Sequence, residues 1–123
     1  MTEKTTRKSS KRSVPAEVRR AVQAAQAKLG EDICVMDLRE LAAFTDFFVI
    51  VSGNSSRHNA ALLEGVEEAL KASGIRPLSV EGRDSADWGL LDYGSFLVHV
   101  FSEAARGHYS LEKLWGDAPK IEY

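Results

Sequence analysis

The chain has 123 residues, of which 44% are hydrophobic and 28% charged, and its 16 Lys and Arg against 18 Asp and Glu give a net charge of −2. A chain of this length buries roughly two-thirds of its unfolded surface, so one domain can form without disulfide or metal staples. The single cysteine, Cys34, excludes an internal disulfide framework and a multi-cysteine zinc site, and it favours a reducing compartment. The longest apolar run, residues 47–51, has the length of a strand and excludes a membrane-spanning helix, which needs roughly 18 to 20 residues.

The small net charge is the sum of a basic N-terminal segment and an acidic remainder of the chain. Residues 1–20 carry seven basic and two acidic side chains, a net charge of +5, whereas the remaining 103 residues carry nine basic and sixteen acidic ones, a net charge of −7. Because phosphate binding depends on Lys and Arg, an acidic body argues against a protein that grips nucleic acid with its whole surface. The acidic body suits a basic protein as its partner.

Residues 1–14 are mostly Thr, Ser, Lys and Arg, which predicts a basic disordered tail ahead of a folded domain at 15–123. A solvated tail, a weak contact with nucleic acid and a targeting role all stay open for it. A first amphipathic helix should begin at Pro15, with Ser13 or Val14 as its N-cap, and run to Leu29, where Gly30 stops it.

Residues 33–38 and 47–51 are short apolar runs, which predict strands buried on both faces in the interior of a sheet. Residues 52–56 break the second strand and supply N-caps for a long helix that ends at residues 73–74. A strand at 77–81 follows.

A hairpin with strands 88–93 and 95–102 should turn around Tyr93 and Gly94, which would pair Asp92 with Ser95 and Trp88 with His99. Period-two alternation then sorts the side chains onto two faces. One face carries Trp88, Leu90, Leu97, His99 and Phe101, and the other carries Gly89, Leu91, Tyr93, Phe96, Val98 and Val100.

Residues 103–123 should begin as a helix through Trp115 that ends at Gly116 and Pro119. The predicted order is therefore α β β α β β β α. This order predicts an α/β fold in which helices flank a mixed sheet.

The segment Gly53-Asn54-Ser55-Ser56-Arg57-His58 joins a strand to a helix, where free N–H groups could hold a phosphate. It lacks the Gly-Lys-[Ser/Thr] ending of a P-loop, so a capped helix start is the simpler interpretation. A strand, Gly-x-Ser and a helix also resemble the entry to nucleotidyltransferases. That chemistry needs two carboxylates one residue apart on a neighbouring strand, and no Asp-x-Asp or Asp-x-Glu follows Gly53.

Other catalytic or metal chemistry finds no support in the sequence. There is no Gly-x-Ser-x-Gly, Cys34 lies in a predicted buried strand, and the histidines are not at metal-ligand spacing. His99, between Leu97 and Phe101 on one sheet face, is typical of a hydrogen-bonded structural histidine. We therefore predict no catalytic residue, no metal and no cofactor.

The most informative cluster is residues 87–93, where Trp88 directly follows Asp87 and Tyr93 directly follows Asp92. Rigid aromatic side chains with flanking charges are typical of the centre of a protein interface. The alternative is a pair of half-buried sheet aromatics, and the two lie on opposite faces of the predicted hairpin.

Seven motifs in this order resemble the ribosomal silencing factor family, RsfS or Iojap, over about residues 15–118. They are Asp37-Leu38, Phe44-Thr45-Asp46-Phe47-Phe48-Val49-Ile50, Ser52-Gly53-Asn54-Ser55-Ser56-Arg57-His58, Val80-Glu81-Gly82, Asp87-Trp88-Gly89-Leu90-Leu91-Asp92-Tyr93-Gly94, Val98-His99-Val100-Phe101 and Tyr109-Ser110-Leu111-Glu112-Lys113-Leu114-Trp115.

The resemblance implies a nucleotidyltransferase-like α/β domain without catalytic carboxylates, in a cytoplasmic protein that is not an enzyme. It implies binding to the large ribosomal subunit through ribosomal protein fourteen, which blocks joining of the small subunit and represses translation when nutrients are scarce. The partner-binding residues that it implies are Asp92 and Tyr93 first, then Trp88, Leu91, Arg57 and His58.

Three alternatives stay open. A residual nucleotidyltransferase or phosphate-binding catalyst would use residues 53–58, and an RNA-binding module would use the tail to touch ribosomal RNA. The free protein could also be a homodimer.

Overall fold

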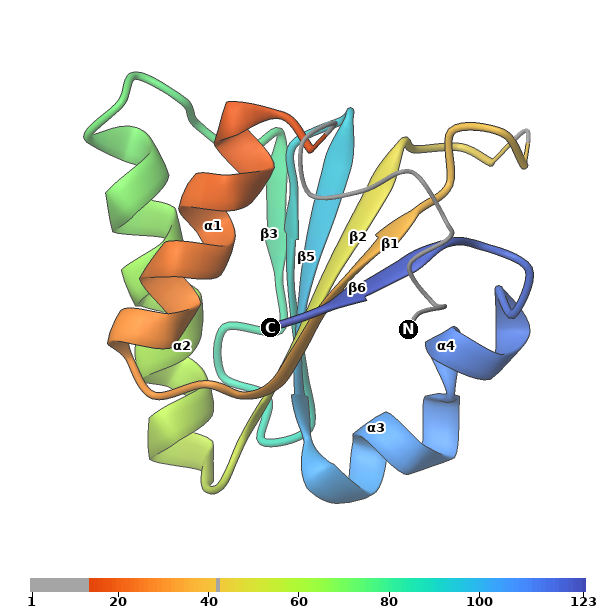
Figure 1. The fold of residues 1–123 in the computed structure, drawn as a ribbon. Coiled ribbons are helices and arrows are strands. Elements are labelled where there is room, and N and C mark those ends of the chain that lie inside the picture. Colours follow the sequence, from red (N-terminus) through yellow and green to blue (C-terminus); the bar gives the residue numbers. More distant parts are fainter. Residues whose placement is uncertain (1–13, 42) are drawn as a thin grey trace.

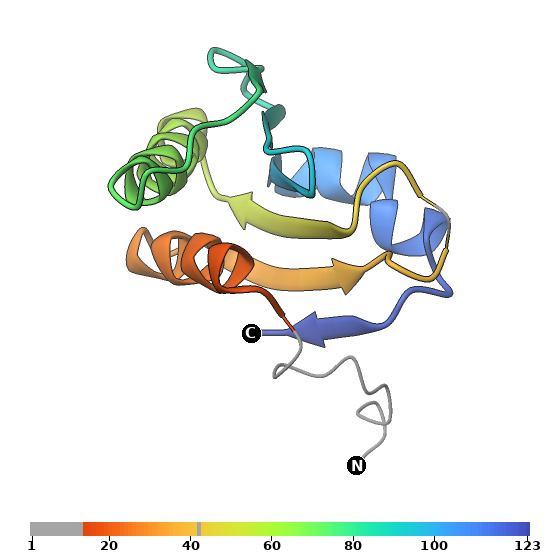
Figure 2. The same ribbon diagram turned by 90° about the horizontal axis from the view of Figure 1, so that it is seen from above.

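The computed structural model describes residues 14–41 and 43–123, and in this part of the chain six strands form one sheet in the order β3-β4-β5-β2-β1-β6. α1 and α2 cover one face of the sheet, and α3 and α4 lie on the other (Figures 1 and 2). The predicted α/β fold with helices flanking a mixed sheet is confirmed. The elements are α1 Ala16–Ala27, β1 Glu31–Asp37, β2 Phe47–Gly53, α2 Ser56–Lys71, β3 Ser79–Glu81, β4 Trp88–Asp92, β5 Phe96–Ser102, α3 Glu103–Tyr109, α4 Leu111–Leu114 and β6 Lys120–Glu122.

The centre of the sheet is the parallel pair β2 and β5, and the other neighbouring strands pair antiparallel. Every residue of β2 is buried, as the unbroken apolar run predicts. One apolar core lies between the sheet and α1 and α2, and a second lies under α3 and α4. None of the helices in the described residues is long and apolar enough to cross a membrane.

The ends of α1 differ from the prediction. Most of the predicted tail lies outside the described residues, but Val14 is only 2% exposed and belongs to the first core. The helix ends at Ala27 and not at the predicted Leu29, which is 78% exposed in a left-handed conformation. Gly30 serves close packing, because a Cβ there would lie 2.4 Å from Cγ2 of Val51.

The hairpin register differs from the prediction by two residues. Asp92 pairs with Leu97 and Trp88 pairs with Phe101, because the turn consists of Gly94 and Ser95 and the N–H of Tyr93 donates to the carbonyl of Phe96 at 3.0 Å. A shift of two residues leaves every side chain on its predicted face, since the period of a strand is two. The predicted division of the hairpin into two faces is therefore confirmed by the two cores.

The C-terminal segment differs most. Ser110 adopts a left-handed conformation, with φ 47°, and splits the predicted helix into α3 and α4. The chain then returns along the sheet as β6, where Ile121 pairs with Val35, and this strand was not predicted.

His99 of β5 is a polar side chain inside the second core, and it is 4% exposed. Its ring meets Phe48 edge-on at 4.6 Å and is stacked with Phe101 at 5.8 Å. Burial lowers the pKa of His99 from 6.5 to about 4, so the imidazole is neutral at pH 7.

His99 should make the fold sensitive to acid. Between pH 6.5 and 4 the unfolded chain binds a proton at this residue that the folded chain does not, so stability falls as the pH falls through this window. The loss amounts to about 3 kcal/mol. Urea denaturation at several pH values measures the free energy of unfolding of the wild type and of a His99→Leu variant. As the pH falls, this free energy should decrease more steeply for the wild type. Parallel curves would contradict this assignment.

Gly82 precedes β4 with φ +73°, and a Cβ there would lie 2.1 Å from the carbonyl oxygen of Trp88. Gly74, with φ +82°, has open space around it. Gly74→Ala should therefore cost only the left-handed strain, about 1 kcal/mol, whereas Gly82→Ala should cost at least about 2 kcal/mol more. Chemical denaturation measures both, and equal losses would show that the contact with Trp88 does not matter.

Candidate functional site

The β3 and β4 end of the sheet presents a face that α3 covers only at one corner, since α3 packs mainly over β5 and β2. Alternation along β4 points Gly89 and Leu91 into the first core and the other side chains to this face, where they are partly exposed. We call this surface the β4 face. It comprises Ser79 and Glu81 of β3, Trp88, Leu90 and Asp92 of β4, and Tyr109 of α3.

The loop before β4 fixes where Trp88 emerges. The hydroxyl of Ser85 accepts hydrogen bonds from the N–H groups of Asp87 and Trp88, both at 3.1 Å. Asp87 in turn accepts from the N–H of Ser102 at 2.9 Å and from its hydroxyl at 3.1 Å. The amide of Asn59 donates to the carbonyl of Ala86 at 2.9 Å and ties the loop to α2.

The side chain of Trp88 is held on several sides. Its indole Nε1–H donates to Nδ1 of His99 at 3.1 Å, and its ring lies 5.0 Å from Phe101 and 4.4 Å from Tyr109. Tyr109 is 45% exposed and was not predicted as a site residue. The sequence carries no signal that joins α3 to β4, since the two meet only through the tertiary fold.

Carboxylates flank the apolar part of the β4 face. Asp92 accepts a hydrogen bond from the N–H of Gly94 at 2.8 Å, so it also stabilises the hairpin turn. Glu81 pairs with Leu90 across β3 and β4 and is exposed. An aromatic and aliphatic stripe with acidic neighbours fits a partner that is apolar at its centre and basic at its rim.

Leu91 and Tyr93 lie on the other side of the sheet. Leu91 is 0% exposed in the first core, so its predicted role as a direct contact is wrong. Tyr93 is half-buried and stacks on Phe96 at 4.8 Å, and its hydroxyl is buried with no hydrogen-bond partner among the described residues. Burial, with a smaller effect of Glu67, raises the pKa of Tyr93 to about 12.

Arg57 and His58 open α2, in the helical layer opposite the β4 face. His58 accepts the N–H of Asn54 at Nδ1, at 3.0 Å, and its Nε2 bonds the carbonyl of Lys28 at 2.8 Å, so it joins the ends of the two helices. The N–H of His58 donates to Ser55, which caps the helix as predicted. These bonds already use N–H groups that a phosphate would need. Arg57 is exposed.

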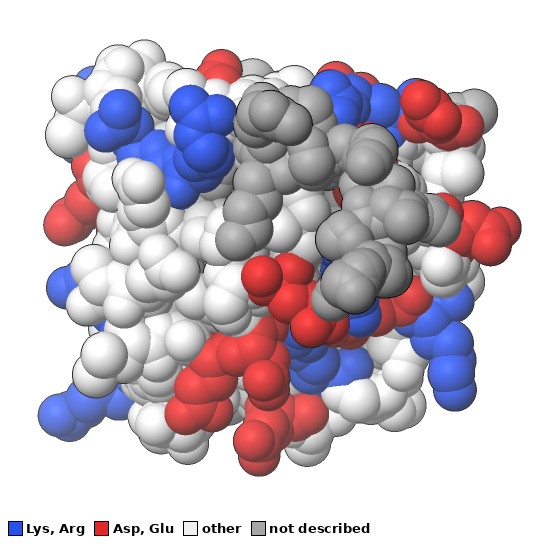
Figure 3. Space-filling view, in the orientation of Figure 1, with Lys and Arg blue, Asp and Glu red and all other residues white. Residues whose placement is uncertain are grey.

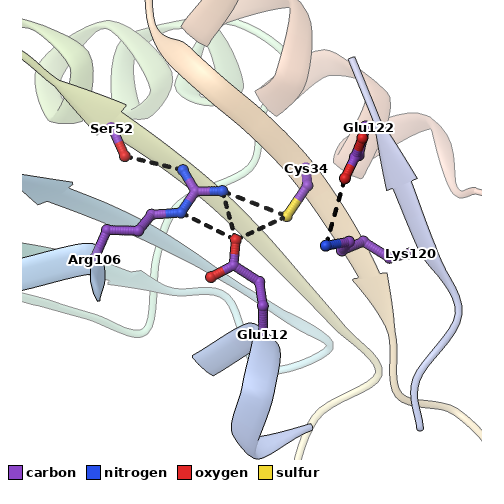
Figure 4. Close-up of polar contacts among 6 residues, drawn as sticks. All are labelled: Cys34, Ser52, Arg106, Glu112, Lys120 and Glu122. Atoms are coloured by element: carbon purple, nitrogen blue, oxygen red, sulfur yellow. Dashed lines mark hydrogen bonds and ion pairs between the residues drawn. The ribbon is translucent and has the colours of Figure 1, made fainter. Parts of the chain in front are cut away.

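A second polar cluster lies at the opposite end of the sheet (Figure 4). The guanidinium of Arg106 donates to Glu112 at 2.7 Å and to Ser52 at 2.9 Å, and it lies 3.8 Å from the sulfur of Cys34. Burial raises the pKa of the Cys34 thiol to about 12, as expected of inert core. A hollow of about 330 Å³ borders this cluster.

Acidic side chains gather below the middle of the molecular face in Figure 3, in the region that β6 and the start of β1 occupy in Figure 1. Asp32, Glu112 and Glu122 line the hollow there. Among residues 14–41 and 43–123, however, no three His, Cys, Asp or Glu side chains are placed to hold a metal ion.

The six predicted site residues therefore do not form one site. Trp88 and Asp92 lie on the β4 face, Leu91 is core, and Tyr93, Arg57 and His58 lie on the side of α1 and α2.

Comparison with known proteins identifies the family. A family model described as "Ribosomal silencing factor during starvation" matches residues 11–123. The Bacillus subtilis protein named ribosomal silencing factor RsfS is 39% identical over 99 residues, which are 80% of this chain and 84% of that protein. The Mus musculus protein named mitochondrial assembly of ribosomal large subunit protein 1 is 38% identical over 87 residues, 68% of this chain and 38% of that protein.

A crystal structure of a Chromobacterium violaceum protein has the same fold, with a TM-score of 0.79 at 33% identity over 81% of this chain and 83% of that one. The predicted family is thereby confirmed over nearly the whole sequence. From the match of residues 11–123 and these identities, the chain belongs to the ribosomal silencing factor (RsfS) family.

Proposed function

We propose that this protein binds the large ribosomal subunit through the β4 face, contacts ribosomal protein fourteen there, and sterically blocks joining of the small subunit, so that translation is repressed when nutrients are scarce. The observation that carries the proposal is the aromatic and acidic composition of the β4 face in a member of this family. The name of the mouse relative points to the large subunit as the particle. A cytoplasmic location goes with this proposal.

The chemistry of the β4 face suits such a partner. Ribosomal proteins are generally basic, and Glu81 and Asp92 stand beside Leu90 and Trp88, so attraction and apolar contact act on the same surface. The mechanism needs no reaction, because a bound protein of this size excludes another surface from the same place. Tyr93, Arg57 and His58 stay as predicted contacts at the margin of the interface, reached around the hairpin turn or from α2.

Charge reversal at Asp92 tests the electrostatic part. Asp92→Lys should weaken binding to large subunits by at least about 1 to 2 kcal/mol. Asp92→Asn keeps an acceptor for the N–H of Gly94 and should lose less binding affinity. Comparing the two variants separates the effect of the charge from the effect on the hairpin turn. The control is Glu68→Lys, the same charge change at an exposed position on α2.

Co-sedimentation with purified large subunits at low and high salt measures these effects, and the difference between Asp92→Lys and wild type should shrink at high salt. Equal weakening by Glu68→Lys would mean that only the net charge of the protein matters, and the assignment to the β4 face would fail.

Truncation of Trp88 tests the apolar part and the blocking mechanism together. Trp88→Ala should reduce large-subunit binding by about 2 kcal/mol or more, because the aromatic anchor of the β4 face is lost. Tyr93→Ala, on the far side of the sheet, should have a smaller effect. In a light-scattering assay of subunit joining, the wild type should inhibit joining in proportion to the fraction of large subunits that it occupies. At the same protein concentration, Trp88→Ala should not inhibit joining.

Binding of the wild type without inhibition of joining would refute steric blocking. Association only with joined ribosomes in a density gradient would refute it as well.

A further inference from the structure

We infer that His99 is a positioning residue that holds the indole of Trp88 in one orientation for the partner, an inference that rests on the proposed function of the β4 face. Its Nδ1 accepts the Nε1–H of Trp88 at 3.1 Å from the neighbouring strand. His99 itself is 4% exposed and cannot touch a partner, so it acts through Trp88.

The hydrogen bond fixes the state of the imidazole. Because Nδ1 accepts, the proton of the neutral ring sits on Nε2. Nε2 is buried and has no hydrogen-bond partner among the described residues. Its surroundings are apolar and aromatic, with Phe48 edge-on at 4.6 Å and Phe101 at 5.8 Å.

An unpaired buried N–H opposes folding, since the donor loses its hydrogen bonds to water and gains none. A leucine at this position of β5 would pack between the same rings without that cost. Histidine at this position is therefore poorly explained by stability. What it supplies, and leucine would not, is a hydrogen-bond acceptor for the indole of Trp88. Groups kept at the expense of stability are typical of functional surfaces.

Orientation matters because Trp88 is only partly buried. The ring contacts with Phe101 and Tyr109 restrict the indole, and the bond to His99 selects the orientation in which Nε1 points inward. The exposed part of the ring then faces the partner. A side chain that is ordered before binding loses less conformational entropy on binding.

The test is a His99→Leu variant of the whole protein, read in two ways. The exchange rate of the Trp88 indole proton, measured by NMR without any ribosome, should rise about tenfold when the acceptor is lost. The Kd for purified large subunits should rise about three- to tenfold. Thermal stability at pH 7 should be unchanged or higher, a result that a purely structural histidine would not give.

A double-mutant cycle with Trp88→Phe tests whether His99 affects binding through the indole N–H of Trp88. Phenylalanine keeps an aromatic ring but has no N–H, so His99→Leu should weaken binding no further in that background. His99→Asn, which keeps an acceptor near the position of Nδ1, should bind better than His99→Leu.

Unchanged indole exchange in His99→Leu would overturn the inference, as would equal weakening with and without the Trp88 indole. Wild-type protein that fails to bind large subunits would overturn the proposed function and the inference together. Wild-type binding that His99→Leu leaves intact would overturn the inference alone.

Discussion

The parallel pairing of β2 with β5 is the constraint on which the rest of the molecule depends. Seven residue pairs join the two strands, from Phe47 and Phe96 to Gly53 and Ser102. Both strands end at the same edge of the sheet, so α2, which follows β2, and α3, which follows β5, both begin there, on opposite faces (Figure 1). The loop before β4 is tied to this same edge through Ser102 and Asp87. The position of Trp88 therefore follows from the central pair.

Sequence patterns could predict the parts of the fold that local periodicity encodes. The buried strands, the capped start of α2 at Ser55 and the two faces of the hairpin are all visible in the order of apolar and polar residues. The error in the predicted register at Gly94 left the assignment of side chains to the two faces correct, because a shift of two residues preserves their alternation. β6 was missed because three residues with one apolar side chain have no periodicity to read, and the strand exists only through pairing with β1.

The candidate site was only partly predictable for a related reason. Trp88 and Asp92 could be named from the cluster of aromatic and acidic residues. The assignment of Leu91 to an interface, however, ignored the alternation along the strand, which already placed Leu91 on the other face of the sheet from Trp88. Tyr109 could not be named from local sequence, since its contact with Trp88 joins residues 21 positions apart through the turn from β5 into α3. His99 was expected to be structural and hydrogen-bonded. Within residues 14–41 and 43–123, the hydrogen bond of its side chain comes from the indole of Trp88 on the β4 face.

The acidic side chains of the folded domain fall into two groups according to their distance from the β4 face. Neighbouring strands lie about 4.8 Å apart, so β6 is about 19 Å from β4 across the sheet, more than two Debye lengths at physiological salt. The carboxylates around the hollow near β6 are therefore largely screened from a partner on the β4 face, whereas Glu81, Asp87 and Asp92 stand within reach of it. In the proposed complex, these local charges would speed association and fix the register of the two surfaces. Its lifetime would depend more on Trp88, because an aromatic anchor acts through contact and desolvation that salt does not screen.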